Sequence, residues 1–237
     1  LLLANRLNYR NHRKIIVIHA CTSFVGGINV ADRYINDSVN QNEVYWRDTH
    51  IRIDGSGSLY LQYIFLCDWN FCSPNKLVPG QRFFCELSDT YENSLVQIVS
   101  SGPDSVSPSI LFTLLKSIDT AKEEILITTP YFIPGESLMD ALIIASMSGV
   151  NVKLLVPYVS DSRIVNAAAH SYYDDLLKAG VRIFRYKKGF IHAKSLVIDN
   201  KLAIVGTANM DQRSFDLNFE VMAVILDHFV AEELRAV

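Results

Sequence analysis

The sequence lacks three features that would assign it to a class at once: a metal-binding cysteine pattern, a long apolar run and an excess of positive charge. The four cysteines, Cys21, Cys67, Cys72 and Cys85, form no Cys-x-x-Cys pair and match no zinc spacing. We therefore expect buried or incidental thiols in a reducing compartment. No cluster of residues suggests a metal site, and we expect no cofactor.

No stretch approaches the roughly 20 apolar residues that cross a bilayer. The 22 basic and 25 acidic side chains give a net charge of −3, which argues against nucleic acid as a partner, since nucleic-acid binders usually carry a basic excess. The hydrophobic fraction of 49% and the length of 237 residues suit a globular protein with a sizeable core. Residues 1–6 lack an initiating Met and are too short for a signal peptide, so we expect a fragment.

An internal repeat is the strongest positive feature. Residues 12–29 and 192–209 align without a gap at an offset of 180 positions, and His, Lys, Val-Ile, Val-Gly and Asn coincide. Each copy predicts a strand (14–18 and 194–198), a turn, a second short strand and a loop that carries the Asn. A His and a Lys two residues apart share one face of a strand, so the two side chains lie together. The shared polar residues are His12, Lys14 and Asn29 in the first copy and His192, Lys194 and Asn209 in the second.

The remaining pattern predicts an α/β fold. Residues 48–54 alternate like a strand, residues 59–71 suggest a helix, residues 73–94 suggest a loop, and residues 100–104 suggest a boundary. After a helix that opens at Ser107-Pro108, strands and helices alternate, which favours parallel strands. The expected strands are 124–129, 152–156 and 181–186, and the expected helices are 136–148 and 162–179.

We expect two pseudo-symmetric halves. About 85 residues of α/β structure precede the second motif within its half, whereas 11 residues precede the first motif. Residues 1–104 are therefore interpreted as the carboxyl part of a first domain that is truncated at its start. Residues 105–237 are interpreted as a second domain that is truncated at its end.

The repeat predicts phosphodiester chemistry. Without a metal, breaking a phosphodiester requires cations and amide donors at the non-bridging oxygens, a neutral nucleophile and an acid for the leaving group. Two histidines on opposite sides of one phosphorus supply the nucleophile and the acid for in-line displacement. Lys14 and Lys194 would neutralise charge, and Asn29 and Asn209 would donate to phosphate oxygens.

Each histidine also needs a carboxylate that fixes its tautomer. Asp48 and Glu220 are the candidates, and the alternative is that they are surface carboxylates. A single His-x-Lys pair is usually an exposed edge pair, but two copies that share Gly and Asn spacing favour catalysis. Tyr131 and Phe132 follow a strand end, where α/β ligands bind, and core packing is an equal interpretation. The other histidines, His50, His170 and His228, are expected to be structural or exposed.

These motifs resemble the phospholipase D superfamily, whose pattern is H-x-K-x4-D followed by G-[GST]-x-N. More narrowly, the sequence is similar to the bacterial cardiolipin synthases. The resemblance implies phospholipase D-like mixed sheets flanked by helices. The stretches that carry it are Arg10–Ile15, Phe24–Asn29, Trp46–His50, Thr129–Pro134, Gly189–Lys194 and Gly206–Phe215.

The resemblance also implies a reaction. Members of that family join two phosphatidylglycerol molecules: one His forms a phosphatidyl-histidine, the other His protonates the departing glycerol, and a second phosphatidylglycerol then attacks to give cardiolipin. No metal is implied. The partners would be phosphatidylglycerol and cardiolipin in the bacterial inner membrane, reached through amino-terminal segments that these residues do not include. The sequence leaves the oligomeric state open.

One position departs from the family pattern. The second motif keeps its acid at Asp199, which the resemblance groups with the catalytic residues, whereas the first motif has His19. Strand alternation places this position on the face opposite His12, which favours a role in the turn. His19 is interpreted either as a change that weakens the first half-site or as the mark of a degenerate copy. A hydrolytic phospholipase D, a transferase that uses serine or ethanolamine, a nuclease and a non-catalytic lipid-binding relative are the alternative functions.

Overall fold

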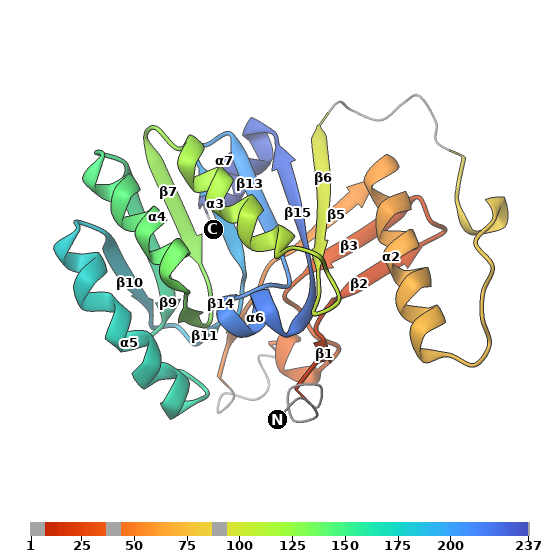
Figure 1. Ribbon diagram of the computed structural model, residues 1–237, viewed down its shortest axis with the longest axis horizontal. Helices are drawn as coiled ribbons and strands as arrows, with labels where there is room; N and C mark the ends of the chain where they lie inside the picture. The colour runs from red at the N-terminus through yellow and green to blue at the C-terminus, as the bar shows by residue number, and fades with distance from the viewer. Residues whose placement is uncertain (1–7, 37–43, 87–93, 237) are drawn as a thin grey trace.

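The computed structural model describes residues 8–36, 44–86 and 94–236 (Figure 1). Within these residues, the largest sheet has eight strands in the order β1-β15-β13-β12-β7-β9-β10, with β6 alongside β15. The strands β7, β9 and β10 run parallel, as expected from the alternating pattern, and β12, β13 and β15 are antiparallel. These strands are β1 (Arg10–Asn11), β6 (Leu95–Ser101), β7 (Glu124–Thr128), β9 (Asn151–Pro157), β10 (Arg182–Tyr186), β12 (Ser195–Ile198), β13 (Leu202–Gly206) and β15 (Asn218–Leu226).

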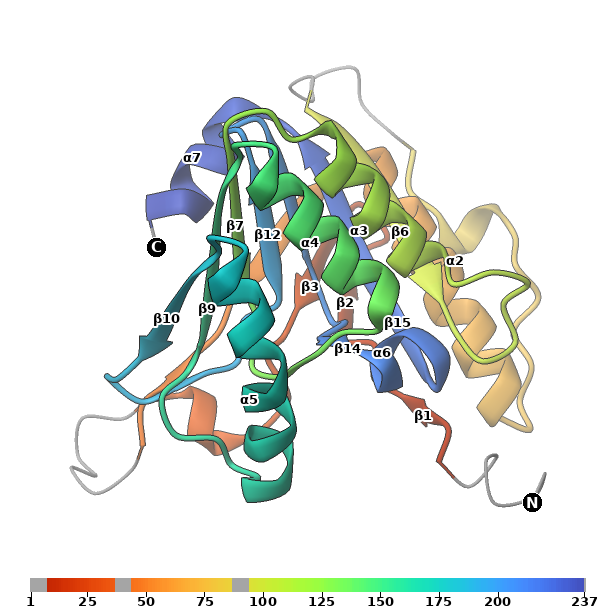
Figure 2. The ribbon, with the colours of Figure 1, turned by 60° about the vertical axis from the view of Figure 1, so that its left-hand side comes forward.

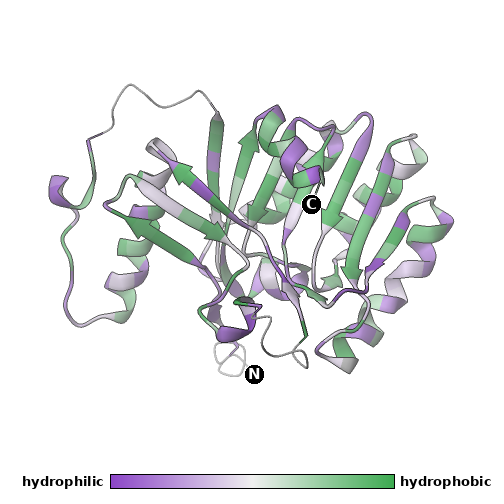
Figure 3. Cartoon of the chain, turned by 180° about the vertical axis from the view of Figure 1, so that it is seen from behind, coloured by the Kyte–Doolittle hydropathy of each residue, from purple (hydrophilic) through white to green (hydrophobic). Residues whose placement is uncertain are grey.

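Three helices cover one face of this sheet, and the C-terminal helix lies on the other face (Figures 1 and 2). The three are α3 (Ser109–Thr120), α4 (Glu136–Met147) and α5 (Arg163–Lys178), and the C-terminal helix is α7 (His228–Ala236). The strands of the large sheet are predominantly green in Figure 3, because this sheet is covered on both faces. Ile110, Leu114, Leu138, Ile127 and Leu196 are among the residues buried between the sheet and its three helices.

A smaller sheet of β2 (Ile15–Ile18), β3 (Thr22–Gly26) and β5 (His50–Asp54) packs beside the large sheet together with α2 (Ser56–Cys72). Val25 and Leu61 from this unit pack in one apolar cluster with Val221 and Ala223 of β15. The two sheets therefore share a core, which fixes the position of the first motif relative to the second.

The two sheets repeat one topology. The order β2-β3-β5 in the small sheet matches β12-β13-β15 in the large one. The N–H of Gly27 donates to Thr49 O (3.1 Å), and the N–H of Thr207, at the equivalent position, donates to Val221 O (2.9 Å). The duplication seen in the sequence is thus also a duplication of strand order and of hydrogen bonding. This agrees with the mixed, phospholipase D-like fold expected from the resemblance.

The observed elements differ from the expected ones at β6 (Leu95–Ser101). The strand β6 was not predicted, because its residues lie between a loop and the proposed boundary. It pairs with β15 along its whole length, from Leu95 with Leu226 to Ser101 with Glu220. The segment before residue 104 therefore pairs with a strand of the second half, and the division of the chain at residue 104 stays a prediction. Residues 87–93 of the expected loop lie outside the described residues.

The expectation of free thiols is wrong for Cys21 and Cys85 and agrees with the structure for Cys67 and Cys72. Cys21 and Cys85 form a disulfide with their Cα atoms 5.6 Å apart, and Cys67 and Cys72 are exposed free thiols. The disulfide joins the turn between β2 and β3 to the segment after the 3-10 helix η2 (Gln81–Phe83). Sequence spacing does not reveal such a pair, because the two residues are brought together only by the fold.

Short elements complete the structure. Two-residue strands form the pairs β4 (Trp46–Arg47) with β11 (Phe190–Ile191) and β8 (Phe132–Ile133) with β14 (Met210–Asp211). The helices η1 (Asp32–Tyr34) and α6 (Gln212–Asp216) follow the two repeats. Among the described residues, no helix combines the length and apolar character needed to cross a bilayer.

Candidate active site

Each motif histidine follows a two-residue strand that pairs with the opposite half of the molecule. The strand β1 runs parallel to the start of β15, and the N–H of His12 donates to Phe219 O (3.0 Å). In the same way β11 runs parallel to β4, and the N–H of His192 donates to Arg47 O (2.7 Å). Both short strands lie at the lower end of the large sheet in Figure 1.

The pairing of these strands across the two halves gives each histidine a carboxylate from the other half. Nδ1 of His12 donates to both oxygens of Glu220 (2.8 and 3.0 Å). Nδ1 of His192 donates to Asp48 Oδ2 (2.7 Å). A proton held on Nδ1 leaves Nε2 with a free lone pair, which is the state required of a nucleophile or a base. Asp48 and Glu220, proposed from the sequence as orienting groups, are therefore both placed on a motif histidine.

Glu220 is held in a fully buried network. Its side chain is 0% exposed, and it accepts hydrogen bonds from the hydroxyl of Thr207 and from Nδ2 of Asn218 (3.1 Å). Burial by itself raises the pKa of a carboxyl group, but the donors around Glu220 hold its pKa below the ordinary value. The group is therefore a carboxylate that keeps the ring of His12 in one orientation.

Asp48 has a different environment. It accepts the N–H of Thr49 (2.7 Å) in addition to His192. The position equivalent to Thr207 is Gly27, and a Cβ placed there would lie 2.2 Å from Asp48 Oδ1. The first copy therefore requires a glycine where the second copy uses a hydroxyl.

Each lysine turns back to the histidine of its own motif. Lys14 Nζ donates to His12 O (2.6 Å), and Lys194 Nζ donates to His192 O (2.5 Å). The motifs were expected to begin within the strands, but β2 and β12 begin one residue after each lysine. The lysines still lie beside their histidines, because the side chain folds back along the connecting segment.

Burial dominates the electrostatics of these groups. It lowers the pKa of Lys194 to about 7 and that of Lys14 to about 8, and the carboxylates of Asp48 and Glu220 offset part of each shift. It also lowers the pKa of His192 to about 4, despite the hydrogen bond to Asp48. The charge of Lys14 acts on both His192 and Lys194, so the two motifs form one electrostatic site.

The motif asparagines have protein partners. Nδ2 of Asn29 donates to the hydroxyl of Tyr34 (2.8 Å). Asn209 hydrogen-bonds Asp211, while its own Oδ1 is buried without a partner among the described residues. Burial raises the pKa of Asp211. Phosphate binding by Asn29 and Asn209 stays a prediction.

Aromatic rings enclose His192, and the sequence analysis missed them. The ring centroids of Tyr34, Trp46 and Phe190 lie 5.9, 5.6 and 6.1 Å from that of His192. A signal was available, because Trp46 and Phe190 each stand two residues before a site residue, and alternate residues of a strand share a face. The rings exclude water from the imidazole, which accounts for its low pKa.

Asp199 lies in the turn after β12, and its grouping with the catalytic residues stays a prediction that its contacts do not support. It follows β12, whose other end is next to Lys194. Its carboxylate accepts three backbone N–H groups at the start of β7, from Lys122, Glu123 and Glu124, at 2.8 to 2.9 Å. These contacts assign it to the turn, as strand alternation indicated.

His19 occupies the equivalent turn in the first copy. Its φ of 51° and that of Ala20, 58°, match the 51° and 52° of Asp199 and Asn200. The backbone of the turn is therefore preserved although the acid is absent. The departure from the family pattern lies at the opposite end of its strand from the histidine.

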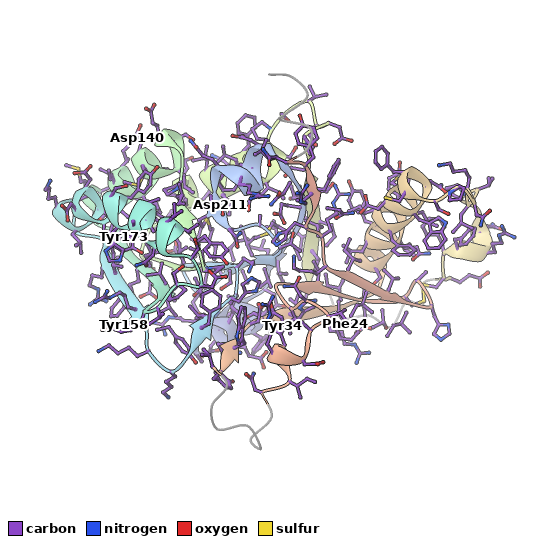
Figure 4. The ribbon with its side chains drawn as sticks, turned by 90° about the horizontal axis from the view of Figure 1, so that it is seen from below. Phe24, Tyr34, Asp140, Tyr158, Tyr173 and Asp211 are labelled. Atoms are coloured by element: carbon purple, nitrogen blue, oxygen red, sulfur yellow. A yellow bond between two sulfur atoms is a disulfide. The ribbon has the colours of Figure 1, made fainter. Side chains whose placement is uncertain are left out.

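Phe132, Tyr131 and His50, which the sequence analysis also considered, have different environments. Phe132 is fully buried in the core, whereas the hydroxyl of Tyr131 donates to Asp161 (2.7 Å). His50 accepts the N–H of Ile28 through Nδ1 (3.3 Å), which supports the loop before Asn29. Figure 4, viewed along the sheet from the end that carries the site, shows Tyr34 and Asp211 on elements from the two halves.

Within the described ranges, no group of three or more His, Cys, Asp or Glu side chains is arranged to hold a metal ion. The groups that could meet a phosphate are imidazole, ammonium and amide. Such a set can neutralise a phosphodiester and move protons on both sides of it.

Comparison with solved structures defines the class of the fold. A phosphatidylserine synthase from Haemophilus influenzae Rd KW20 superposes with a TM-score of 0.68 at 15% identity, over 97% of this chain and 62% of that one. The phospholipase D family member Nuc from Salmonella typhimurium gives a TM-score of 0.51 at 24% identity, over 61% of this chain and 91% of that one. These likenesses concern the fold, which is of the phospholipase D class.

Sequence comparison identifies the family. A family model described as the cardiolipin synthase, PLD-like domain matches residues 114–237, more than half of the chain, and the chain belongs to this family. The major cardiolipin synthase ClsA of Bacillus subtilis (strain 168) is 47% identical over 229 residues, 97% of this chain and 47% of that protein. Cardiolipin synthase 2 of Staphylococcus epidermidis (strain ATCC 12228 / FDA PCI 1200) is 46% identical over 231 residues. The chain spans about half the length of these relatives.

Proposed function

We propose that the protein carrying this chain is a phosphatidyltransferase that joins two phosphatidylglycerol molecules into cardiolipin and glycerol. One observation carries the proposal: two histidines from opposite halves are each hydrogen-bonded to a carboxylate of the other half, and each has a lysine of its own motif beside it, Lys194 buried and Lys14 half-buried. Membership of the cardiolipin synthase family supports the choice of lipid.

The first step transfers the phosphatidyl group to the protein. Nε2 of one motif histidine attacks the phosphorus of phosphatidylglycerol, and the P–O bond to the glycerol headgroup breaks on the opposite side. The other histidine enters this step protonated on both nitrogens and donates its Nε2 proton to the departing glycerol oxygen, which leaves it neutral. Lys14 and Lys194 neutralise the charge on the non-bridging oxygens, and their burial strengthens this interaction.

The second step reverses the proton transfer. A glycerol hydroxyl of a second phosphatidylglycerol attacks the phosphorus, and the histidine that is now neutral accepts its proton. The P–N bond breaks, which releases cardiolipin and restores the first histidine. Water and alcohols compete for the same intermediate. The aromatic rings of Tyr34, Trp46 and Phe190 around His192 would favour transfer to a lipid by keeping water out.

The substrates place the reaction at a membrane. Phosphatidylglycerol and cardiolipin are bilayer lipids, and in the family that the chain resembles the reaction belongs to the bacterial inner membrane. We include this location in the proposal.

The test uses the full-length protein with vesicles of phosphatidylglycerol. We expect cardiolipin and glycerol in equal amounts, and neither product from His12→Ala or His192→Ala. His170→Ala is the matched control, since this exposed ring packs against Tyr173 (5.0 Å between centroids) on α5. Phosphatidic acid as the main product would identify a hydrolase instead. Transfer to added serine or ethanolamine in preference to phosphatidylglycerol would identify a different transferase.

A further inference from the structure

The ring of Tyr34 lines the site, but its hydroxyl has no part in the chemistry described above. Its hydroxyl lies 3.1 Å from Nδ1 of His192 and accepts a hydrogen bond from Asn29 Nδ2 (2.8 Å). It is the last residue of η1, which follows the first repeat. Asn29, expected to meet phosphate, thus holds a tyrosine against the histidine of the other motif.

The positions of the hydrogens follow from these contacts. Asp48 Oδ2 is 2.7 Å from Nδ1 of His192, and two lone pairs would repel at that distance, so Nδ1 carries the proton. The hydroxyl oxygen of Tyr34 is then a second acceptor for the same N–H. A phenol oxygen can accept two hydrogen bonds, and those from His192 and Asn29 fill both places.

The carboxylates of Glu220 and Asp48 are held differently, which explains why the second acceptor for His192 is not a carboxylate oxygen. Glu220 offers both oxygens to His12 and is held by two side-chain donors, Thr207 and Asn218. In the first copy the equivalent positions are Gly27 and Trp46, which offer no such donor to Asp48. Asp48 contacts His192 through one oxygen, and the other accepts the N–H of Thr49.

We propose that Tyr34 is a positioning residue for His192. With Asp48 it forms a two-point support for the Nδ1 side of the ring, which fixes the direction of Nε2. The inference rests on the proposed function for its effect on rate, but the contact itself requires no substrate. Tyr34 thereby gives Nδ1 of His192 a second acceptor, as the second oxygen of Glu220 does for His12.

The packing around Tyr34 is suited to this role. Its ring meets that of Trp46 edge to face (5.4 Å between centroids), and the guanidinium of Arg33 lies over Trp46 (4.2 Å). Aromatic and cation–π contacts of this kind keep a ring in place when its hydroxyl is removed. Tyr34→Phe should therefore delete the hydrogen bonds that the hydroxyl accepts from His192 and Asn29 and leave the aromatic rings around His192 in place.

The experiment compares Tyr34→Phe with Tyr173→Phe in the full-length protein. Tyr173 is a half-buried tyrosine on α5 that packs against His170, outside the site. We expect Tyr34→Phe to lower kcat for phosphatidylglycerol about tenfold, the scale of the hydrogen bond to His192, with KM unchanged. Tyr173→Phe should leave both constants unchanged.

A second measurement reports on the contact without turnover. In protein labelled with ¹⁵N-histidine and free of substrate, the Nδ1–H resonance of His192 is assigned by its loss in His192→Ala. We expect this resonance to shift in Tyr34→Phe and to stay in place in Tyr173→Phe. A resonance that does not move in Tyr34→Phe would overturn the proposal. A raised KM at unchanged kcat would also overturn it, because that result would show that the hydroxyl binds substrate. An unmodified enzyme inactive on phosphatidylglycerol would refute the proposed function, whereas the resonance test would still decide the role of Tyr34.

Discussion

At the scale of single residues, the site depends on a few buried polar contacts. Glu220 is the clearest case, because it is fully enclosed and holds His12 through both of its oxygens. Removing such a charge leaves the ring free to adopt the wrong tautomer, with the proton on the nitrogen that should attack or accept a proton.

Glu220→Gln tests this role. We expect kcat to fall by about 10³-fold or more, since the substitution keeps the shape of the side chain but removes the charge that selects the tautomer of His12. The measurement is steady-state turnover of phosphatidylglycerol. Glu136→Gln, at an exposed position at the start of α4, is the control and should retain full activity. A Glu220→Gln enzyme within tenfold of the unmodified one would contradict the orienting role.

The two motif lysines predict a pH dependence. Burial lowers the pKa of Lys194 to about 7 and of Lys14 to about 8, so both ammonium groups lose protons as the pH rises through this range. Only the charged forms neutralise a phosphodiester. We therefore expect kcat/KM, which reports on the free enzyme, to fall from about pH 7 upward. A kcat/KM that stays level well above pH 8 would show that these lysines are not the charge-neutralising groups.

Several of these residues could be predicted from the sequence, and others could not. The repeat singled out both histidines and both lysines because polar identities recurred at fixed spacing. Asp48 and Glu220 followed from the chemical need of a histidine for an acid. Which acid serves which histidine could not be predicted, because it depends on β1 pairing with β15 and on β4 pairing with β11.

At the scale of elements, the turn after β3 determines the geometry of the first half-site. Gly27 lies against the carboxylate of Asp48, and the equivalent Thr207 instead donates to Glu220. The two copies of one strand–turn unit have thus diverged in how they support a carboxylate. A side chain at position 27 would move Asp48 and, through it, His192.

Gly27→Ala tests this dependence. A Cβ at this position would lie 2.2 Å from Asp48 Oδ1, so the carboxylate must shift. We expect kcat to fall by about 10²-fold, the usual effect of a displacement of about 1 Å in a catalytic group. Gly80→Ala is the matched control, since a Cβ there meets nothing within 4 Å. Turnover of Gly27→Ala equal to that of Gly80→Ala would show that the position of Asp48 is not critical.

Elements were predictable where they were long and periodic. The helices α3, α4 and α5 and the strands β7, β9 and β10 were found close to their observed bounds, because apolar residues recur at the helical or strand period. The two-residue strands β1, β4 and β11 are too short to show any period. These short strands nevertheless position the two histidines, so the geometry of the site could not be predicted from the periodicity of the sequence.

At the scale of the whole molecule, we propose that the two halves contribute to one site and do not form two. Each histidine takes its backbone acceptor and its carboxylate from the opposite half, and the two sheets share a core. Neither half-site is complete without the other. Loss of either histidine should therefore abolish the reaction.

The double variant His12→Ala/His192→Ala tests whether the site is shared. Each single variant should lose about 10³-fold or more in turnover, and the double variant should be no more than severalfold below the weaker single, because residues that act as a unit are not additive. Two independent sites would give a different result, in which each single variant keeps about half of the activity. Assays at equal protein concentration distinguish the two cases.

The disulfide shows what the whole fold adds to the sequence. Cys21 and Cys85 stand far apart in the chain and meet because the β2–β3 turn approaches the segment after η2. Spacing alone could not reveal this pair. In the same way, the aromatic rings that surround His192 come from three separate elements and belong to Tyr34, Trp46 and Phe190.

The most direct test of the central claim is to quench the full-length enzyme during turnover of phosphatidylglycerol labelled with ³²P and to map the modified residue. The account predicts a phosphatidyl-histidine at either His12 or His192, one of the two and not both. The same label should disappear when a second phosphatidylglycerol is added and reappear in cardiolipin. Label on both histidines, or on neither while cardiolipin still forms, would contradict a shared site in which one imidazole attacks and the other transfers the proton.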